Sequence, residues 1–208
     1  MLIHPWDAAV DDDEWQRIAR SQGFGHFIAS GVGREVPVVV PTQYVLSEDA
    51  TVMLAHFARP NPVWRALEDS RHALMSIAGD WAYVPSHLKV GPGDDPSLGV
   101  PTTYYGAVQL IGVVDILDDS ESKLEVLRAL LADLEPGGTY ADPKVHTDLL
   151  NGIRGVRLTI TEVKAKFKYG GNVTDSLREV AVAGLAQRNG AGDQAAIKHL
   201  TRRTPPQH

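Results

Sequence analysis

The sequence predicts a mainly β protein with a largely antiparallel sheet and peripheral helices. Alternating or continuous apolar runs with the length of strands follow one another along the chain. The early runs are joined by connections short enough for hairpins, which pair strands antiparallel. Strands and helices do not alternate regularly, as they would in a doubly wound α/β fold.

The first part of the chain supplies one helix and three strands to this prediction. "DDDEWQRIARSQG" begins with carboxylates that suit a helix N-terminus, and it ends at Gly23. The strand-like runs that follow are "GHFIAS", "EVPVVVPTQYVLS" and "TVMLAHFA", separated by turn signals. Pro37 and Pro41 have no N–H for a neighbouring strand, so the second run is expected at an edge, a bend or a bulge.

The rest of the chain continues with a short helix from Pro62 to about Ser70 and two longer strands, "HALMSIAGDWAYV" and "TTYYGAVQLIGVVDIL". The loop between these strands, residues 85–101, is long and rich in Pro, Gly and Asp, as functional or mobile loops often are. A helix with an apolar face follows in "SESKLEVLRALLADLEP", and "VRLTITEVKAKFKYG" predicts the last strand. The leucines expected to pack that helix on the sheet are Leu124, Leu127, Leu131 and Leu134. Two helices around "RNGAGD" and a frayed end at residues 204–208 complete the chain.

Composition places the chain among globular proteins with a packed core. Of its 208 residues, 43% are apolar, which suits one domain or one domain with an appendage. The net charge of -6 argues against a surface built to coat nucleic acid, and the absence of cysteine excludes disulfides and thiolate chemistry. The N-terminus has no apolar signal core and no window reaches the roughly 20 apolar residues of a membrane span, so the expected location is the cytoplasm.

Several common catalytic motifs are absent from the sequence. It contains no phosphate loop of the GxxxxGK[ST] type, no GxGxxG, no HExxH and no GxSxG. The eight histidines show no metal-ligand spacing, so no metal site is expected. Any redox chemistry would therefore need a bound cofactor.

The segment "HFARPNPVW" places the side chains of His56, Arg59 and Asn61 at the end of a predicted strand, just before a helix begins at Pro62. A guanidinium group binds phosphate oxygens in a bidentate manner, and a helix N-terminus adds a partial positive charge. These donors suggest a phosphate site. In the alternative that the pattern leaves open, Arg59 pairs with a surface carboxylate and Asn61 caps the helix.

A second cluster lies in "PTTYYGAVQLIG", where strand alternation sends Thr103 and Tyr105 to one face and Thr102 and Tyr104 to the other. One of these pairs could face a planar ligand. Alternatively, aromatic and β-branched residues occur here only because they are good strand formers.

A third cluster is the row of Lys164, Lys166 and Lys168 in "KAKFKYGGN", which shares one face of the last strand. Such a row is often a solvated face or one that protects a sheet edge. The functional interpretation is an anion site.

These clusters stand among segments that together resemble one known family. The segments are "HPWDAAVDD", "VPVVVPTQYVL", "HFARPNPVW", "PTTYYGAVQLIG" with the helix after it, and the late "AKFK". In order and spacing they resemble the PaiB-type proteins, known as FMN-binding negative transcriptional regulators. The resemblance covers roughly Met1 to Asn172.

The resemblance implies a split β-barrel of the FMN-binding-protein type over residues 1–172, with residues 173–208 as a C-terminal helical appendage. It also implies a homodimer that binds FMN at the subunit interface. In this picture His56, Arg59 and Asn61 bind the FMN phosphate. The candidates for the ribityl chain, the ring and a further cofactor contact are Thr42, Tyr44, Thr103, Tyr105 and Lys168. One departure from the family's "KFKLSQN" is that Gly170 and Gly171 replace a Ser-Gln pair, which leaves open whether FMN binding is weakened.

The implied function is that of an FMN-binding transcriptional regulator. The alternatives are a flavin-dependent oxidoreductase acting on a small molecule, because flavin itself carries the chemistry, and a barrel scaffold without its cofactor. The only candidate surface for direct DNA binding is the C-terminal helix pair, whose basic residues are Lys198, His199, Arg202 and Arg203. These residues lie at the end of the second helix, whereas DNA-reading residues usually lie near its start. Whether the protein is an enzyme stays open.

Overall fold

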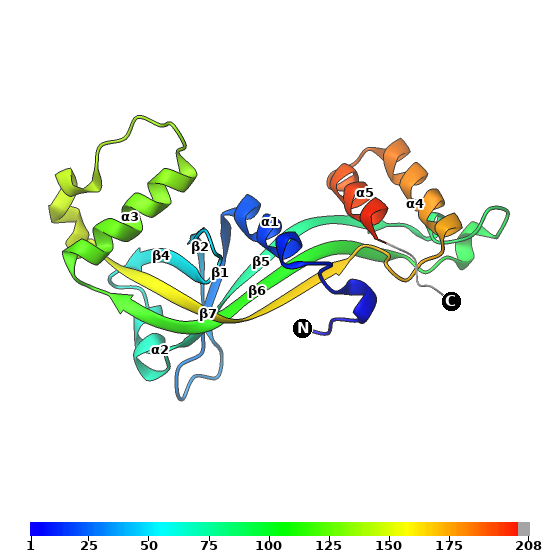
Figure 1. The fold of residues 1–208 in the computed structure, drawn as a ribbon. Helices are drawn as coiled ribbons and strands as arrows, with labels where there is room; N and C mark the ends of the chain where they lie inside the picture. Colours follow the sequence, from blue (N-terminus) through cyan, green and yellow to red (C-terminus); the bar gives the residue numbers. More distant parts are fainter. Residues whose placement is uncertain (204–208) are drawn as a thin grey trace. The chain divides into compact units, whose positions relative to one another are not determined.

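The structure is a computed structural model that describes residues 1–203, and the frayed end predicted at residues 204–208 lies outside them. Its strands form a seven-stranded sheet in the order β2-β1-β5-β6-β7-β4-β3 (Figure 1). Strand β1 pairs antiparallel with β2 and β5, and β4 pairs antiparallel with β3 and β7. The predicted mainly antiparallel sheet is confirmed. The strands are β1 (Phe24–Ala29), β2 (Val38–Gln43), β3 (Val45–Leu46), β4 (Val52–Ala58), β5 (His72–Val84), β6 (Thr102–Leu117) and β7 (Ile153–Lys168).

The predicted helices are also present. The α-helices are α1 (Asp12–Gln22), α2 (Val63–Asp69), α3 (Ser120–Leu134), α4 (Asp175–Arg188) and α5 (Asp193–Arg202). Short 3-10 segments are η1 (Pro5–Asp7), η2 (Ser86–Leu88), η3 (Pro96–Leu98) and η4 (Pro143–Gly152). Within residues 1–203, none of the helices has both the length and the hydropathy needed to cross a membrane.

The chain divides into two compact units. The first unit comprises Met1–Ile18, Ala78–Val108 and Ala165–His208, and the second comprises Ala19–Ile77 and Gln109–Lys164. The strands β5, β6 and β7 contribute residues to both units. Helices α4 and α5, predicted as an appendage after residue 172, belong to the first unit together with the N-terminal segment.

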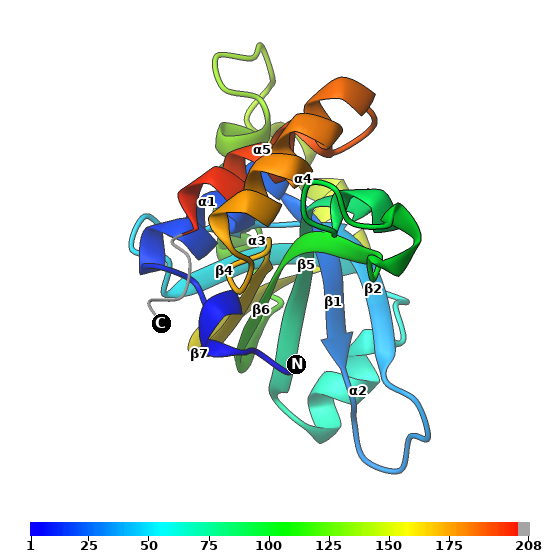
Figure 2. The same ribbon diagram turned by 90° about the vertical axis from the view of Figure 1, so that its right-hand side faces the viewer.

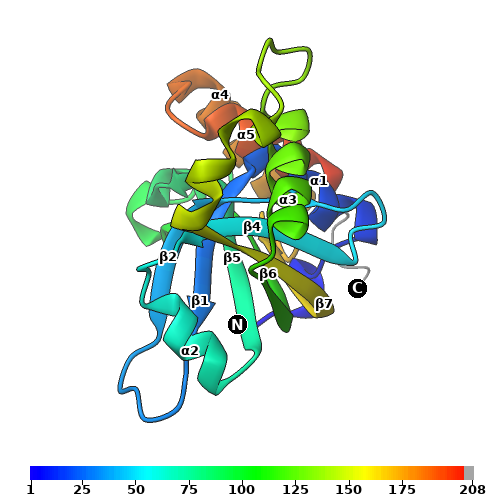
Figure 3. The ribbon, with the colours of Figure 1, turned by 90° about the vertical axis from the view of Figure 1, so that its left-hand side faces the viewer.

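The second unit has an aromatic core between its strands and α2. Alternate residues of β1 and β4 point into this core, as the pleat of a strand requires, among them Phe27, Met53 and Phe57. The ring centroids of Phe27 and Phe57 are 5.1 Å apart, and those of Phe57 and Trp64 are 5.6 Å apart. The buried Trp64 therefore joins α2 to the sheet core. Figure 3 shows α2 beside β1 and β2, and α3 across β4.

The run predicted as one strand over residues 35–47 is two strands, so this prediction was wrong in part. The break falls at Tyr44, whose backbone N–H donates to the carbonyl of Gly23 and whose hydroxyl donates to the carbonyl of Ala19. Its ring is buried, so the chain turns to place it in the core. The expectation for Pro41 is confirmed, because it lies in β2, the first strand of the sheet order and therefore an edge.

The buried face of α3 also differs from the predicted one. The residues that α3 buries are Lys123, Val126 and Leu130, while Leu134 is 44% exposed. Val126 and Leu130 pack with Leu117, and Val45 and Leu54 cover this cluster. The helix is thus rotated by about one residue from the leucine row, which is possible because the stem of a lysine can lie along apolar surface. Leu127 and Leu131 become available to line a pocket.

The first unit is held together by buried charges around α4 and α5, which pack side by side (Figure 2). The buried guanidinium of Arg178 in α4 donates to the carbonyl of Leu200 in α5. Beside them, Arg203 donates to the carboxylate of Glu14 in α1 at 2.8 Å, and both side chains are 6% exposed. A buried ion pair therefore fixes the end of α5 to α1.

Candidate functional site

The first unit contains a pocket of about 460 Å³ at the beginning of β6 and the end of β7. We call it the lysine pocket, because Lys89, Lys166 and Lys168 line it together with His4, Trp6, Asp7, residues 100–102, Tyr104, Gly170 and Asn172. Three of the segments quoted for the family resemblance, "HPWD", "PTTYY" and "KFK", meet at this pocket. They lie far apart in the sequence, and the sheet brings the last two together on neighbouring strands.

Local structure explains how these side chains reach the pocket. Lys166 and Lys168 are two residues apart on β7 and point to the same side of the strand. A bridge between Ala8 and Lys166 holds the N-terminal segment against this strand. In that segment the rings of His4 and Trp6 stack, with centroids 4.7 Å apart and planes 9° from parallel.

The charges of the lysine pocket are unbalanced. Lys166 donates to the carbonyl of Leu2, and its Nζ lies 3.7 Å from the buried carboxylate of Asp7, the only acidic side chain among the described lining residues. Lys168 donates to the hydroxyl of Thr102 at 2.7 Å, which is a neutral partner. Lys89 lies over the ring of Tyr104, 5.7 Å from its centroid. The pocket therefore has two ammonium groups more than carboxylates.

The pKa of Lys89 is lower than usual, in part because of this excess of positive charge. It is lowered first by burial and second by the charge of Lys168. An anion placed between the two ammonium groups would relieve their repulsion and favour the charged form of Lys89. The pocket is therefore suited to an anionic group.

The two glycines that depart from the family pattern have a structural reason. Gly170 has a φ of +68°, and a Cβ there would lie 2.7 Å from the hydroxyl oxygen of Tyr104. A Cβ on Gly171 would lie 2.2 Å from the carbonyl oxygen of Trp6. The pair thus lets the chain pass close to the N-terminal segment. The buried hydroxyl of Tyr104 has no hydrogen-bond partner among the described residues.

The residues of β6 that line the lysine pocket are not the cofactor candidates Thr103 and Tyr105. Thr102 and Tyr104 line the pocket, while Thr103 and Tyr105 alternate to the other face. The Nζ of Lys166 lies 5.8 Å from the centroid of the Tyr105 ring, so this ring is near the lysine row without lining the pocket. A cofactor contact of Thr103 or Tyr105 stays a prediction.

In the second unit, the side chain of Arg59 is engaged within the protein. Its Nε donates to the carbonyl of Asn151 at 2.7 Å, and its two terminal nitrogens donate to the two oxygens of Asp118. Asn61 precedes the N-cap residue Pro62, and its Oδ1 accepts from the N–H of Val63, the first residue of α2, at 2.9 Å. This geometry matches the structural alternative for "HFARPNPVW". A phosphate role for Arg59 and Asn61 stays a prediction, and it would require Asp118 to be displaced from Arg59.

Asp118 is the centre of a cationic cluster in this unit. Besides Arg59, its carboxylate lies 3.0 Å from Nζ of Lys123 and 3.1 Å from Nε of Arg154. The pKa of Asp118 is held well below its usual range, first by the hydrogen bonds from Arg59. The side chain of Lys123 is only 3% exposed, so Asp118 compensates a buried charge.

We expect Asp118→Asn to lower the melting temperature at pH 7 by about 2–4 °C, because solvent screens this partly exposed cluster. The pKa of Asp118 is lower in the folded than in the unfolded state, so its stabilisation is present above pH ~4 and is lost as the pH falls. The difference from the parent protein should therefore shrink towards pH 2. Calorimetry at both pH values measures it, with Asp115→Asn, an exposed carboxylate of β6, as control. An equal difference at both pH values would contradict the role given to Asp118.

The remaining predicted residues of the second unit, Thr42 and Tyr44, share no pocket among the described residues, and their cofactor contacts stay predictions. Tyr44 is buried in the core, and its pKa is raised first by burial and then by Asp133. Thr42 lies on the edge strand β2 and donates to the carbonyl of Gln43. Neither residue lines the lysine pocket or the pocket around His56 described next.

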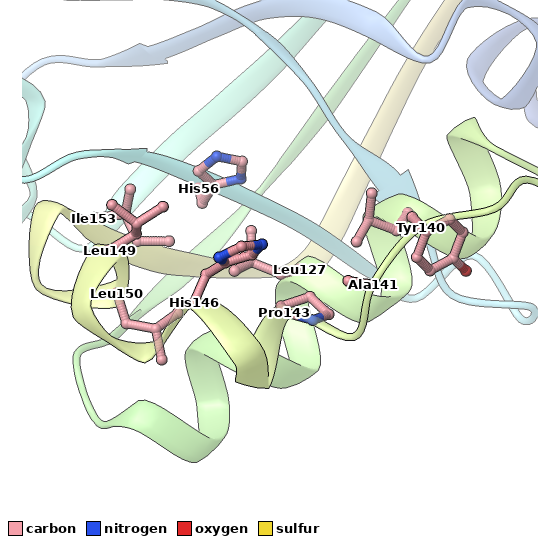
Figure 4. A pocket seen from close by; sticks show the side chains of 10 residues that line it. His56, Leu127, Tyr140, Ala141, Pro143, His146, Leu149, Leu150 and Ile153 are labelled. Carbon is pink, nitrogen blue, oxygen red and sulfur yellow. The ribbon is translucent and has the colours of Figure 1, made fainter.

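His56 lines a separate pocket of about 430 Å³ within the second unit (Figure 4). We call it the histidine pocket after His56 and His146, which with Tyr140 are its polar lining residues. The other lining residues are Leu127, Leu131, Ala141, Pro143, Leu149, Leu150 and Ile153. Burial lowers the pKa of His56, and its Nδ1 has no hydrogen-bond partner in residues 1–203. The described part of the chain holds no group of three or more His, Asp or Glu side chains placed to bind a metal ion.

Comparison with known proteins gives a family match over most of the chain. The family model described as "Putative FMN-binding domain" matches residues 1–162. A comparison with curated proteins found no match.

Solved structures share the fold at low sequence identity. The flavocytochrome Anf3 from Azotobacter vinelandii is 20% identical, with 90% of this chain and 78% of that chain covered and a TM-score of 0.62. The FAD and heme binding protein from Mycobacterium smegmatis is 17% identical, with 85% and 79% covered and a TM-score of 0.60. These matches confirm the predicted fold class, a largely antiparallel split β-barrel with peripheral helices.

Proposed function

The chain belongs to the family of FMN-binding domains, which makes FMN its cofactor, and we propose that it holds the FMN phosphate in the lysine pocket. The observation that carries this proposal is the surplus of positive charge at Lys89 and Lys168. A phosphate monoester has a charge of about −1.5 to −2 at pH 7 and accepts several hydrogen bonds. Lysine binds such a group as a point charge with three donors.

The residues of the lysine pocket fit such a cofactor in three respects. Within residues 1–203, Lys89 and Lys168 have no carboxylate in direct contact, because Asp7, the one acidic residue among the described lining residues, lies beside Lys166. The stacked rings of His4 and Trp6 offer an aromatic surface next to these cations. The volume of about 460 Å³ is within the range of small-molecule sites.

In this proposal the phosphate is bound by Lys89 and Lys168, with the hydroxyl of Thr102 positioning the ammonium group of Lys168. Bound FMN supplies the capacity to transfer electrons, and the protein's part is to bind and orient it. Arg59 is the less favoured phosphate ligand, since its guanidinium already has the carboxylate of Asp118 as partner.

The proposal is tested by titrating the purified protein with FMN while flavin fluorescence is measured. We expect saturable quenching at micromolar concentration. The Kd for riboflavin should be about two orders of magnitude or more higher, because riboflavin lacks the phosphate and therefore loses both lysine contacts. No quenching by the protein, or equal affinity for FMN and riboflavin, would overturn the proposal.

The finer assignments stay predictions from the family resemblance. We extend the proposal to a PaiB-type regulator that acts as a homodimer, for which light scattering should give a mass near twice 22.6 kDa. Direct DNA binding through the C-terminal helix pair is not favoured, because two of its four predicted basic residues, His199 in α5 and Arg203 just after it, are engaged in the first unit. His199 stacks on Tyr169 with centroids 4.2 Å apart, and Arg203 pairs with Glu14.

A further inference from the structure

The histidine pocket of the second unit is a cavity that the proposed binding of the FMN phosphate in the lysine pocket does not use. Its walls come from α3, from η4 and the chain before it, and from β4 and β7. None of the ten described residues that line it is Lys, Arg, Asp or Glu. A ligand of this pocket would therefore find no fixed opposite charge, which favours an uncharged molecule.

The apolar lining of the pocket is distinct from the packed core of the second unit. On α3, the core positions are Val126 and Leu130, whereas Leu127 and Leu131 turn to the pocket. At the opposite wall, Leu149 is 69% exposed and Tyr140 is 40% exposed. Large apolar side chains that line an open pocket and remain in contact with water gain free energy when an apolar ligand covers them.

His56 is the polar group within this apolar surrounding. It shares the side of β4 that carries Leu54, which packs below α3. Burial favours the neutral imidazole, and its buried Nδ1 has no hydrogen-bond partner in residues 1–203. Figure 4 shows the ring of His56 on the strand side of the pocket, with His146 among the apolar side chains opposite.

We propose that the histidine pocket is a second binding site, which takes a neutral, mainly apolar small molecule with one hydrogen-bonding group for an imidazole. The volume of about 430 Å³ and an apolar lining with few polar groups are those of small-molecule sites. The site goes beyond the proposed FMN function and does not depend on it.

The test uses Nile red, an uncharged apolar dye whose fluorescence rises in apolar surroundings, added to the full chain. We expect saturable binding by the parent protein. Leu149→Asp should raise the Kd of the dye about tenfold, because it replaces an apolar wall by a charge. Leu149 is exposed enough for the fold to tolerate this change.

The matched control is Leu98→Asp, the same substitution at a leucine of η3 that is 74% exposed and lies outside the pocket. It should leave the affinity for Nile red within about twofold of the parent. Absence of saturable binding, or an equal loss in the two variants, would overturn the proposal. Circular dichroism of both variants separates loss of the site from loss of the fold.

Discussion

Replacing both Lys89 and Lys168 by alanine is expected to raise the Kd for FMN by about two orders of magnitude or more. A hydrogen bond to a charged group contributes about 1.5–3 kcal/mol, so each lysine accounts for roughly one to two orders of magnitude in affinity. Riboflavin, which lacks the phosphate, should bind the double variant about as well as the parent. Fluorescence titration with both flavins measures the two constants.

Two further variants locate the effect. Lys164→Ala is the matched control, because Lys164 lies on β7 at the same alternation as Lys166 and Lys168 but pairs with Glu162 outside the pocket. It should leave the Kd for FMN within about twofold. Arg59→Ala tests the phosphate role predicted from "HFARPNPVW". If Arg59→Ala loses affinity for FMN but not for riboflavin, and the double lysine variant binds FMN normally, Arg59 and not the lysine pair binds the phosphate.

Glu14→Ala is expected to lower the free energy of unfolding by about 3–5 kcal/mol, the cost of leaving a buried charge without its partner. In the folded protein Arg203 donates to Glu14, and its guanidinium lies 5.3 Å from the centroid of the Phe167 ring. Glu14 also accepts from the N–H of Val10, so its loss removes a second bond of the N-terminal segment. Urea unfolding followed by circular dichroism measures the change.

The control for this variant is Glu125→Ala, which removes a carboxylate that is 59% exposed and lies 3.4 Å from Arg157. Exposed ion pairs contribute little, so its effect should be much smaller. If Glu14→Ala and Glu125→Ala shift the unfolding curve equally, the buried pair does not anchor α5 to α1 as we infer.

Much of the fold could be predicted because its signals are local. Turn residues and strand-like apolar runs located the strands, and the carboxylates of "DDDEW" marked the start of α1. The break at Tyr44 could not be predicted, because it depends on a hydroxyl that reaches the carbonyl of Ala19. The buried face of α3 was missed for a similar reason. From the sequence alone Lys123 is expected at the surface. In the structure it is buried, because Asp118 and the carbonyl of Leu150 bind its ammonium group.

The candidate site was only partly predictable. Lys168 could be named as a candidate because a lysine row on a strand is visible as alternation in the sequence, and its cofactor role stays a prediction. Lys89 was missed because it lies in the long loop, where no periodicity shows which side chains turn inward; the loop's length was the only signal. Alternation pairs Thr102 with Tyr104 but cannot tell which face of β6 meets the ligand.

The central claim is that the lysine pocket holds the FMN phosphate, and a crystal structure of the protein grown with FMN tests it most directly. We predict phosphate density within hydrogen-bond distance of Nζ of Lys168 and Lys89, with the ion pair of Arg59 and Asp118 intact. Phosphate density on the guanidinium of Arg59, with Asp118 displaced, would contradict the claim.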